Sequence, residues 1–426
     1  MKNKTTLNRR KFLNVASLAA TASVVPMSTF AQSFTPEADA LPVNTEHNVT
    51  GPILNRIGEI LEIKTICVEP GKFLGVGTEY GLDKNGHTVV TKKVMEPNRY
   101  IGWPTIVRTH TDELIVAFSG DRDGHICPFG KTQLITSNDN GKTWSEPRTI
   151  TNTQLDDRDA GIIQTKKGTL LVSWFTSLAF ERQANQITKD RYARIAEKIG
   201  DEAKKRLLGN WVRRSEDMGK TWGEPIRTVV TAPHGPISLK NGDLMYVGMG
   251  IWKDRGEVVA EKSTDDGKTW KTIGYLPKNP AFPTLSEPHV IELKSGKLLA
   301  LVRNEPKDRT QCYLLQSEST DGGKIWTEMR STGIWGYPPH LTMLKNGWLL
   351  VVYGCRREPF GIRACLSKDE GKTWDIANEI NLGNAVNQDL GYPSSVQLSD
   401  GSILTVYYQA PKMGEPTVVM STHWKI

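Results

Sequence analysis

The sequence lacks the residue patterns that usually hold a metal or a redox centre. Its five cysteines include no C-x-x-C pair, and its eight histidines form no H-x-x-x-H or H-E-x-x-H motif. Because zinc and thiol–disulfide sites commonly use these spacings, we predict neither a catalytic metal nor a cofactor. A structural Ca²⁺ site is left as an alternative. We interpret the cysteines as buried thiols, with a Cys355–Cys365 bridge across a hairpin as the alternative.

Basic stripes and long apolar runs are also missing. The formal net charge is +7, but the N-terminal segment supplies much of it, since no acid occurs before Glu37. No run of Lys and Arg is interleaved with aromatic residues, which excludes the usual nucleic-acid-binding surfaces. The most apolar stretch, Val15–Val25, is too short to span a bilayer, so we predict no membrane anchor. The sequence does not indicate an oligomeric state.

The N-terminus has the features of an export signal. Arg9 and Arg10 precede Phe-Leu, a short apolar stretch and small residues up to Ala31. We therefore predict a twin-arginine signal peptide over residues 1–31, a polar linker over 32–54 and a folded domain over 55–426. The predicted location is periplasmic or secreted.

Helical sequence is scarce. Only residues 183–208, rich in Lys, Arg, Glu and Ala, have a helical composition. They interrupt one of the strand repeats described below. This insertion is either a solvated surface helix or a wall or lid beside a site.

What the sequence does contain is one motif repeated five times. It reads S-x-D-x-G-K-x-W and occurs at Ser137–Trp144, Ser215–Trp222, Ser263–Trp270, Ser319–Trp326 and Ser367–Trp374. The Asp accepts hydrogen bonds from nearby N–H groups, the Gly permits a tight turn, and the Trp folds back as an apolar plug. Each copy predicts a stapled turn between two strands. The copies begin 78, 48, 56 and 48 residues apart, and a period near 50 suits four-stranded propeller blades.

A second repeat accompanies the first. It combines an apolar-alternating stretch, a short turn and another strand, and its six copies begin at Gly102, Asp159, His234, Ser286, Gly336 and Gly391. Together the repeats predict an all-β, six-bladed β-propeller of four-stranded antiparallel blades. The last copy has no stapled turn after it, so Glu59–Pro70 is predicted to supply its outer strand and close the ring. The alternative is a seven-bladed propeller to which Gly71–Pro97 contributes.

The propeller prediction groups residues that are far apart in sequence. Loops that enter the innermost strand of each blade, and loops that join the second strand to the third, open on one face around the axis. These loops carry many Arg, carboxylate, Tyr and His residues, including Asp159, Tyr337 and Asp389. Several Arg in one pocket need anionic partners, so we favour a ligand with a carboxylate or sulfate over internal pairing alone.

The stapled turns resemble the Asp-boxes, or BNR repeats, of the sialidase superfamily, and the resemblance covers the whole chain after the leader. It implies a Tyr nucleophile, a Glu that activates it, an Asp acid/base and three Arg that grip a substrate carboxylate. By position, Tyr392 resembles the nucleophile, Glu287 its partner and Asp123 the acid/base. Arg303 resembles the second Arg and Arg356 the third.

The sequence departs from the family pattern at two points. Where the family has its first Arg motif, this chain has Gly102-Trp103-Pro104, and the acid/base loop also carries His125. Arg122 and Arg158 are further candidates for binding the substrate. Trp103 is either a stacking platform for the sugar or a core residue. Arg357 and Arg363 are alternatives for the third Arg.

Three functions fit these residues. The first, narrowly favoured, is a sialidase-like exo-glycosidase that acts on a terminal carboxylated sugar, sialic or uronic, of an anionic oligosaccharide. The second is an elimination enzyme, a polysaccharide lyase or oligosaccharide dehydratase. In it His125 and a tyrosine, Tyr392 or Tyr337, act as base and acid. Arg122 and Arg158 neutralise the uronate carboxylate. The third is a non-catalytic propeller that binds glycans.

Overall fold

The computed structural model describes residues 53–70, 79–82, 84–86, 88–92, 98–183, 186–251 and 254–426. These residues belong to one compact unit, Ala38–Ile426. The predicted signal peptide lies outside the described residues, as does nearly all of the predicted linker.

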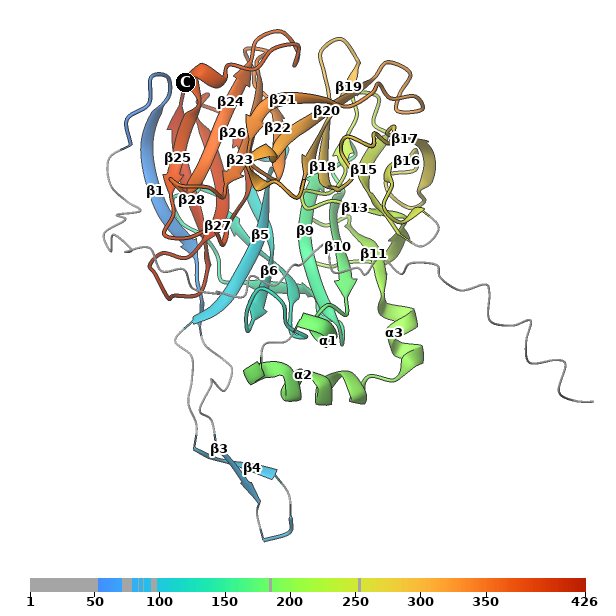
Figure 1. The fold of residues 1–426 in the computed structure, drawn as a ribbon, viewed down its shortest axis with the longest axis vertical. Coiled ribbons are helices and arrows are strands. Elements are labelled where there is room, and N and C mark those ends of the chain that lie inside the picture. Colours follow the sequence, from blue (N-terminus) through green and yellow to red (C-terminus); the bar gives the residue numbers. More distant parts are fainter. Residues whose placement is uncertain are drawn as a thin grey trace, which may run out of the picture. The chain divides into compact units, whose positions relative to one another are not determined.

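Six antiparallel sheets follow one another along the chain as the blades of a β-propeller (Figure 1). Blade 1 contains β2 (Glu69–Pro70), β5 (Asn98–Arg108), β6 (Leu114–Arg122), β7 (Lys131–Ser137) and β8 (Arg148–Thr151). Blade 2 contains β9 (Asp156–Gln164), β10 (Leu170–Ser177), β11 (Gly209–Ser215) and β12 (Ile226–Thr228). Blade 3 contains β13 (Val230–Thr231), β14 (Ile237–Ser238), β15 (Leu244–Gly250), β16 (Val258–Ser263) and β17 (Lys271–Tyr275).

The second half of the chain supplies the other three blades. Blade 4 contains β18 (Leu285–Glu292), β19 (Leu298–Asn304), β20 (Tyr313–Ser319) and β21 (Arg330–Trp335). Blade 5 contains β22 (Pro339–Met343), β23 (Leu349–Cys355), β24 (Gly361–Ser367) and β25 (Ile380–Asn384). Blade 6 contains β26 (Leu390–Gln397), β27 (Ile403–Gln409), β28 (Val418–Lys425) and β1 (Glu59–Cys67).

The ring is closed by its first long strand. β1 pairs antiparallel with β28, from Glu59 opposite Lys425 to Cys67 opposite Val419, and Figure 1 shows it beside the last strands of the chain. This confirms the predicted origin of the outer strand. The described part of residues 71–97 forms a separate two-stranded hairpin, β3 (Glu79–Leu82) and β4 (Thr88–Lys92). The seven-bladed alternative is therefore wrong.

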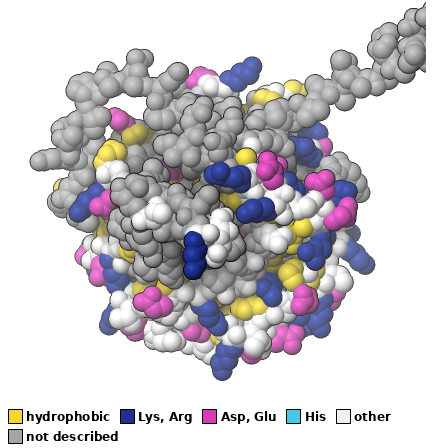
Figure 2. Space-filling view, turned by 90° about the horizontal axis from the view of Figure 1, so that it is seen from below, with side chains coloured by type: hydrophobic (Ala, Val, Ile, Leu, Met, Phe, Trp, Pro, Cys, Tyr) yellow, Lys and Arg dark blue, Asp and Glu magenta, His cyan; other side chains and the backbone are white. Residues whose placement is uncertain are grey.

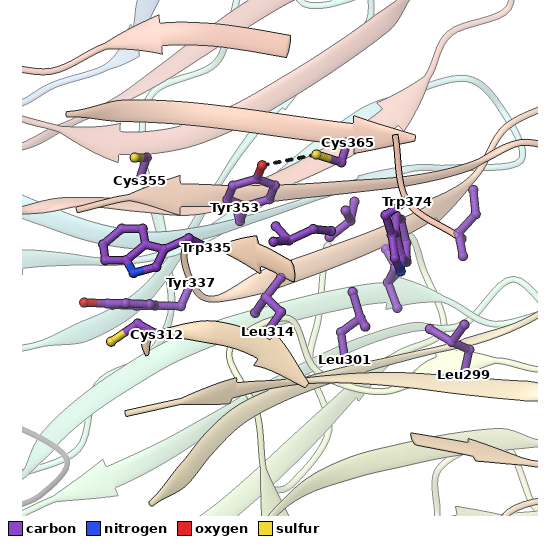
Figure 3. Close-up of a cluster of buried hydrophobic side chains, with 14 of the residues drawn as sticks. Leu299, Leu301, Cys312, Leu314, Trp335, Tyr337, Tyr353, Cys355, Cys365 and Trp374 are labelled. Carbon is purple, nitrogen blue, oxygen red and sulfur yellow. Dashed lines mark hydrogen bonds between the residues drawn. The ribbon is translucent and has the colours of Figure 1, made fainter. Parts of the chain in front are cut away.

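Packing between blades buries the middle of each sheet. In five of the six blades the second strand is buried along its whole length, which explains its nearly continuous apolar sequence. Figure 3 shows one cluster between blades 4 and 5, where Leu301 and Leu314 face Tyr353 and Cys365. Burying one Leu side chain stabilises a fold by roughly 1.5–3 kcal/mol, so many such contacts hold the blades together.

The five stapled turns join the third strand of a blade to the fourth, as predicted. In the first of them, Asp139 Oδ1 accepts from Ser137 Oγ at 2.8 Å and from the Thr143 amide at 2.9 Å. The Gly141 amide donates to Ser137 Oγ at 3.0 Å. The same Ser–Asp and Gly–Ser bonds recur in the other four copies. The five Trp therefore occupy equivalent places in successive blades.

The predicted helical insertion is also present, between β10 and β11. It contains α1 (Phe180–Gln183), α2 (Gln186–Lys198) and α3 (Asp201–Leu207). Phe180, Tyr192 and Ala196 are buried in one cluster with Cys127 and Leu155 of blades 1 and 2. The insertion therefore packs against the loop that follows β6, where it forms a wall behind that loop.

All five cysteines are buried free thiols. In blade 5, Cys355 lies opposite Gly361 and Cys365 lies opposite Val351, so the alternative of a bridge between these two cysteines is wrong. Instead, the Cys365 thiol and the Tyr353 hydroxyl are hydrogen-bonded at 3.3 Å (Figure 3).

Charged side chains of both signs share the surface. On the described part of the face in Figure 2, Lys and Arg are interspersed with Asp and Glu. Among the described helices, none has the length and hydropathy that crossing a membrane requires.

Candidate active site

Tyr392 and Glu287 meet although they come from different blades. Tyr392 lies near the start of β26 and Glu287 near the start of β18, and the Tyr392 hydroxyl donates a hydrogen bond to Glu287 Oε1. Glu287 Oε2 accepts from Arg303, at the end of β19. The other terminal nitrogen of Arg303 pairs with Glu305 at 2.7 Å. The structure thus links three of the predicted site residues in one hydrogen-bonded chain.

The surroundings of Tyr392 keep its hydroxyl protonated. The side chain is almost fully buried, and burial raises its pKa well above the ordinary value, with Glu287 and Asp159 adding to the effect. Tyr392 is therefore a neutral phenol at physiological pH. Glu287 is positioned to accept its proton.

Arg356 places a positive charge near Asp389 and Tyr392. It directly follows β23, and its Nε donates to the Leu390 carbonyl at 3.1 Å. Its Nη2 donates to the Tyr408 hydroxyl at 3.3 Å. No carboxylate in the described ranges forms an ion pair with it. Since a partly buried guanidinium is stabilised by a counter-charge, Arg356 is suited to bind an anionic group of a ligand.

Trp103 packs among the candidate site residues. Its ring lies 4.5 Å from the Arg158 guanidinium carbon and 4.8 Å from that of Arg122, and it meets His125 edge-on at 5.0 Å. Only 1% of its surface is exposed. It therefore fits the core alternative, because it offers a sugar almost no area for stacking. Its contact with the Tyr392 ring, at 6.2 Å between centroids, joins the two groups of predicted residues.

Arg122 is an internal ion-pair partner. It has no exposed surface, and its Nη1 lies 2.7 Å from Asp156 Oδ1. Further hydrogen bonds reach Ser119 Oγ at 2.9 Å and the His125 carbonyl at 3.0 Å. The predicted role in direct substrate binding does not agree with this burial, because a ligand has no access to the guanidinium. Arg122 instead holds the loop that follows β6.

Arg158 is buried but loosely paired. Its closest carboxylate is Asp156, with 3.9 Å between Arg158 Nε and Asp156 Oδ2. No hydrogen bond within the described ranges reaches its Nε, and the guanidinium stacks on Trp103 instead. Arg158 is thus held mainly by this stacking and not by a close ion pair within the described ranges.

His125 belongs to a network that the sequence did not predict. Its Nδ1 lies 2.9 Å from the Tyr100 hydroxyl and 3.3 Å from Asp389 Oδ1. The same Asp389 oxygen accepts from the hydroxyls of Tyr100 at 2.9 Å and Tyr408 at 3.1 Å. The side chains of His125 and Asp389 are 40% and 38% exposed, so both face open space. The network lies next to Trp103, whose ring contacts His125, Tyr100 and Tyr408.

Neighbouring charges act in opposite directions on the pKa of His125. Enclosure lowers the pKa of His125, and the Arg158 and Arg356 guanidinium groups lower it further, although Asp389 acts to raise it. Burial acts to raise the pKa of Asp389, but hydrogen bonds from His125 and Tyr100 lower it overall. His125 is therefore neutral near pH 7 and can accept or pass a proton.

Asp123, the predicted acid/base, is the first residue of the loop that follows β6, and it is partly exposed.

Asp157 and Asp159, on β9, are buried carboxyls in two different settings. Asp157 accepts from the Thr153 amide at 2.7 Å and the Thr153 hydroxyl at 3.0 Å, and burial raises its pKa to about 8. Asp159 lies among the catalytic candidates, and burial together with Glu287 raises its pKa to about 7 against the effect of Arg158.

Three histidines near the axis are packing groups. His234, His289 and His340 lie with ring centroids 4.6–5.7 Å apart. His289 Nδ1 accepts from the Leu341 amide at 3.0 Å, and burial lowers its pKa to about 3. A cavity of about 430 Å³ runs beside them along the carboxyl-terminal halves of the innermost strands. It lies away from Glu287 and Tyr392, which are near the starts of their strands.

Among the described residues, no group of three or more His, Cys, Asp or Glu side chains is arranged to hold a metal ion.

The fold and this pocket define a sialidase-like β-propeller. The model of the BNR repeat-like domain family matches residues 192–405, which is half of the chain, and the chain therefore belongs to that family. This confirms the resemblance carried by the five stapled turns.

Solved structures share the fold at low identity. A protein of unknown function from Dyadobacter fermentans is 23% identical, with a TM-score of 0.64 over 77% of this chain and 95% of that chain. The NanB sialidase from Streptococcus pneumoniae is 15% identical, with a TM-score of 0.55 over 77% and 68%. The intramolecular trans-sialidase from Ruminococcus gnavus is 15% identical, with a TM-score of 0.55 over 77% and 94%. A search of curated proteins gave no match.

Proposed function

We propose that this protein is an exo-glycosidase that releases a terminal carboxylated sugar, sialic or uronic, from an anionic oligosaccharide. The observation that supports this most directly is the hydrogen bond from the Tyr392 hydroxyl to Glu287. A buried tyrosine beside a carboxylate is a nucleophile whose base is already in place. Arg356, which has no carboxylate partner in the described ranges, supplies the charge that a sugar carboxylate requires.

The proposed reaction has two displacements. In the first, the Tyr392 oxygen attacks the anomeric carbon, Glu287 takes the hydroxyl proton, and the bond to the leaving oxygen breaks. An acid protonates that oxygen, and the family resemblance assigns this step to Asp123. In the second, water attacks the anomeric carbon and gives a proton to the conjugate base of that acid. The bond to Tyr392 breaks, and Glu287 returns its proton to Tyr392. A neutral nucleophile suits an anionic sugar, because it avoids repulsion between two carboxylates.

Product analysis tests this function. The protein is incubated with sialyl-lactose and with oligosaccharides that end in a uronic acid, and the products are followed by mass spectrometry and ultraviolet absorbance. Hydrolysis adds one water to the summed product mass. Elimination instead creates an unsaturated uronate that absorbs in the ultraviolet. Unchanged substrates that nevertheless bind would contradict both enzymatic functions and support a glycan-binding propeller.

The hydrogen-bonded pair of His125 and Asp389 favours elimination on a uronic acid as the second candidate. Removal of the hydrogen next to a uronate carboxylate needs a base, and a neutral imidazole held by a carboxylate is a common one. The Tyr100 hydroxyl, 2.9 Å from the same His125 nitrogen, extends the path for a proton.

Replacing His125 by alanine separates the two candidates. In the glycosidase the loss of activity is expected to stay below about tenfold, because a carboxyl group protonates the leaving oxygen. In the elimination enzyme the expected loss is about 10²-fold or more, the scale of a missing general base. The measurement is kcat/KM on the confirmed substrate, with thermal unfolding as the control for folding.

We also infer that residues 1–31 direct export by the twin-arginine route. Replacing Arg9 and Arg10 by Lys is expected to leave the full-length precursor in the cytoplasm, because the arginine pair is the recognised feature of such leaders. Cell fractionation and immunoblotting measure this. Normal export of the variant would show that another pathway carries the protein.

A further inference from the structure

Four innermost strands share one backbone irregularity on the face of the pocket. Trp103, Asp159, Glu287 and Tyr392 have φ values of 56°, 54°, 45° and 50°. Each lies in a break of the register between the first and second strands of its blade, where two residues oppose one. The four breaks lie at Gly102/Thr105, Ser173/Phe175, Ser286/His289 and Gly391/Ser394. The same β-bulge therefore recurs in blades 1, 2, 4 and 6.

A bulge of this kind destabilises the backbone locally and is often found at a functional site. A residue other than glycine in this backbone region costs on the order of 1–3 kcal/mol, and these outliers gather at functional sites. A bulge also re-aims the side chain that it carries. Two of the four bulges carry Glu287 and Tyr392, the pair on which the proposed function rests. A third carries Trp103, which supports Arg158. The remaining bulge carries Asp159.

We propose that Asp159 is the catalytic acid/base of this site, the group that protonates the leaving oxygen and later accepts the proton of the attacking water. This inference rests on the proposed glycosidase function and assigns one step of it to a residue outside the family pattern.

The surroundings of Asp159 suit a carboxyl that carries a proton. The residue is 8% exposed, and Oδ1 is buried without a hydrogen-bond partner in the described part of the chain. Burial, and then the negative charge of Glu287, raise its pKa to about 7, while Arg158 and Arg122 act to lower it. Asp159 in turn helps to raise the pKa of Tyr392, which places the two groups in electrostatic contact. A carboxyl near its pKa at neutral pH is best placed to give up a proton and recover it.

The proton balance closes over one turnover. In the first displacement the Asp159 carboxyl gives its proton to the leaving oxygen as the glycosidic bond breaks, and Glu287 receives the proton of Tyr392. In the second, the Asp159 carboxylate takes a proton from water as its oxygen bonds to the anomeric carbon. Glu287 then reprotonates Tyr392 as the tyrosyl bond breaks.

The test compares two leaving groups on the same acidic sugar. An oligosaccharide alcohol leaves poorly and needs an acid, whereas nitrophenol leaves readily without one. Asp159→Asn is expected to lose about 10²-fold or more in kcat/KM on the oligosaccharide and less than about tenfold on the nitrophenyl glycoside. Asp157→Asn is the matched control, because Asp157 is also buried with a raised pKa but is bonded to Thr153. It is expected to keep wild-type activity on both substrates.

The pH profile of the unaltered protein gives a second readout that needs no variant. Because Asp159 must be protonated to act, kcat/KM on the oligosaccharide is expected to fall as pH rises above about 7. With the nitrophenyl glycoside this fall in kcat/KM at high pH should be small. In Asp159→Asn it should be absent.

Other results would overturn the assignment. Equal losses on both substrates would make Asp159 a binding or structural residue. A loss that depends on the leaving group in Asp123→Asn, and not in Asp159→Asn, would place the acid in the loop after β6. If the unaltered protein releases no sugar from either substrate, the proposed function fails and this assignment fails with it.

Discussion

Replacing Tyr392 by phenylalanine is expected to reduce turnover by on the order of 10³-fold or more while the substrate still binds. The change removes only the hydroxyl, which forms the hydrogen bond to Glu287. The ring keeps its contacts with Trp103 and Tyr408, at centroid distances of 6.2 and 5.9 Å. Binding is expected to persist, since Arg356 and the pocket walls are unchanged. Single-turnover kinetics and calorimetric titration measure the two effects separately.

Tyr408→Phe is the matched control for this prediction. Its hydroxyl donates to Asp389 and accepts from Arg356, and it lies in the same aromatic cluster as Tyr392. Its removal should weaken activity far less than the removal of the Tyr392 hydroxyl. Full activity of Tyr392→Phe on a confirmed substrate would contradict both enzymatic mechanisms considered above.

Replacing Arg122 by methionine is expected to destabilise the folded protein by about 3–5 kcal/mol. Methionine fills much of the same volume but leaves the fully buried Asp156 carboxylate with only the distant Arg158, at 3.9 Å, as a cationic neighbour in the described ranges. It also removes the donors to Ser119 and to the loop carbonyl of His125. Chemical unfolding monitored by tryptophan fluorescence measures the change.

The double variant Arg122→Met with Asp156→Asn is the control. Removing the carboxylate charge should recover part of the loss, because the cost of the single change comes chiefly from an uncompensated buried charge. If Arg122→Met instead keeps wild-type stability and loses only ligand affinity, Arg122 contacts the substrate directly, as the sequence suggested.

The fold was predictable because its signals are local. The Ser–Asp and Gly–Ser bonds of each stapled turn join residues at most four positions apart, so eight residues of sequence contain the whole pattern. The number of blades followed from counting the two repeats. The origin of the closing strand followed from the missing sixth staple, since an unpaired edge in the last blade needs a partner from elsewhere.

The site was predictable only in part, because its contacts join distant residues. The Tyr392–Glu287 pair was anticipated through equivalent positions in different blades and the family resemblance, although 105 residues separate the two. The network on Asp389 was not anticipated. Tyr100 and Tyr408 lie in strands that alternate like any core strand, and period two does not distinguish a tyrosine facing the core from one facing a pocket. For the same reason Trp103 fitted a sugar platform as well as the buried ring that it is.

Closure of the propeller by β1 and β28 ties the completion of the fold to the synthesis of its last blade strand. β1 leaves the ribosome first among the blade strands, yet its partner is the last strand to be made. Until then blade 6 lacks its outer strand, and two sheet edges are open to mispairing with other chains. A ribosome that stops early therefore yields an open ring, whatever the quality of the earlier blades. This protein is proposed to cross a membrane already folded. Pairing of β1 with β28 would therefore have to precede its export.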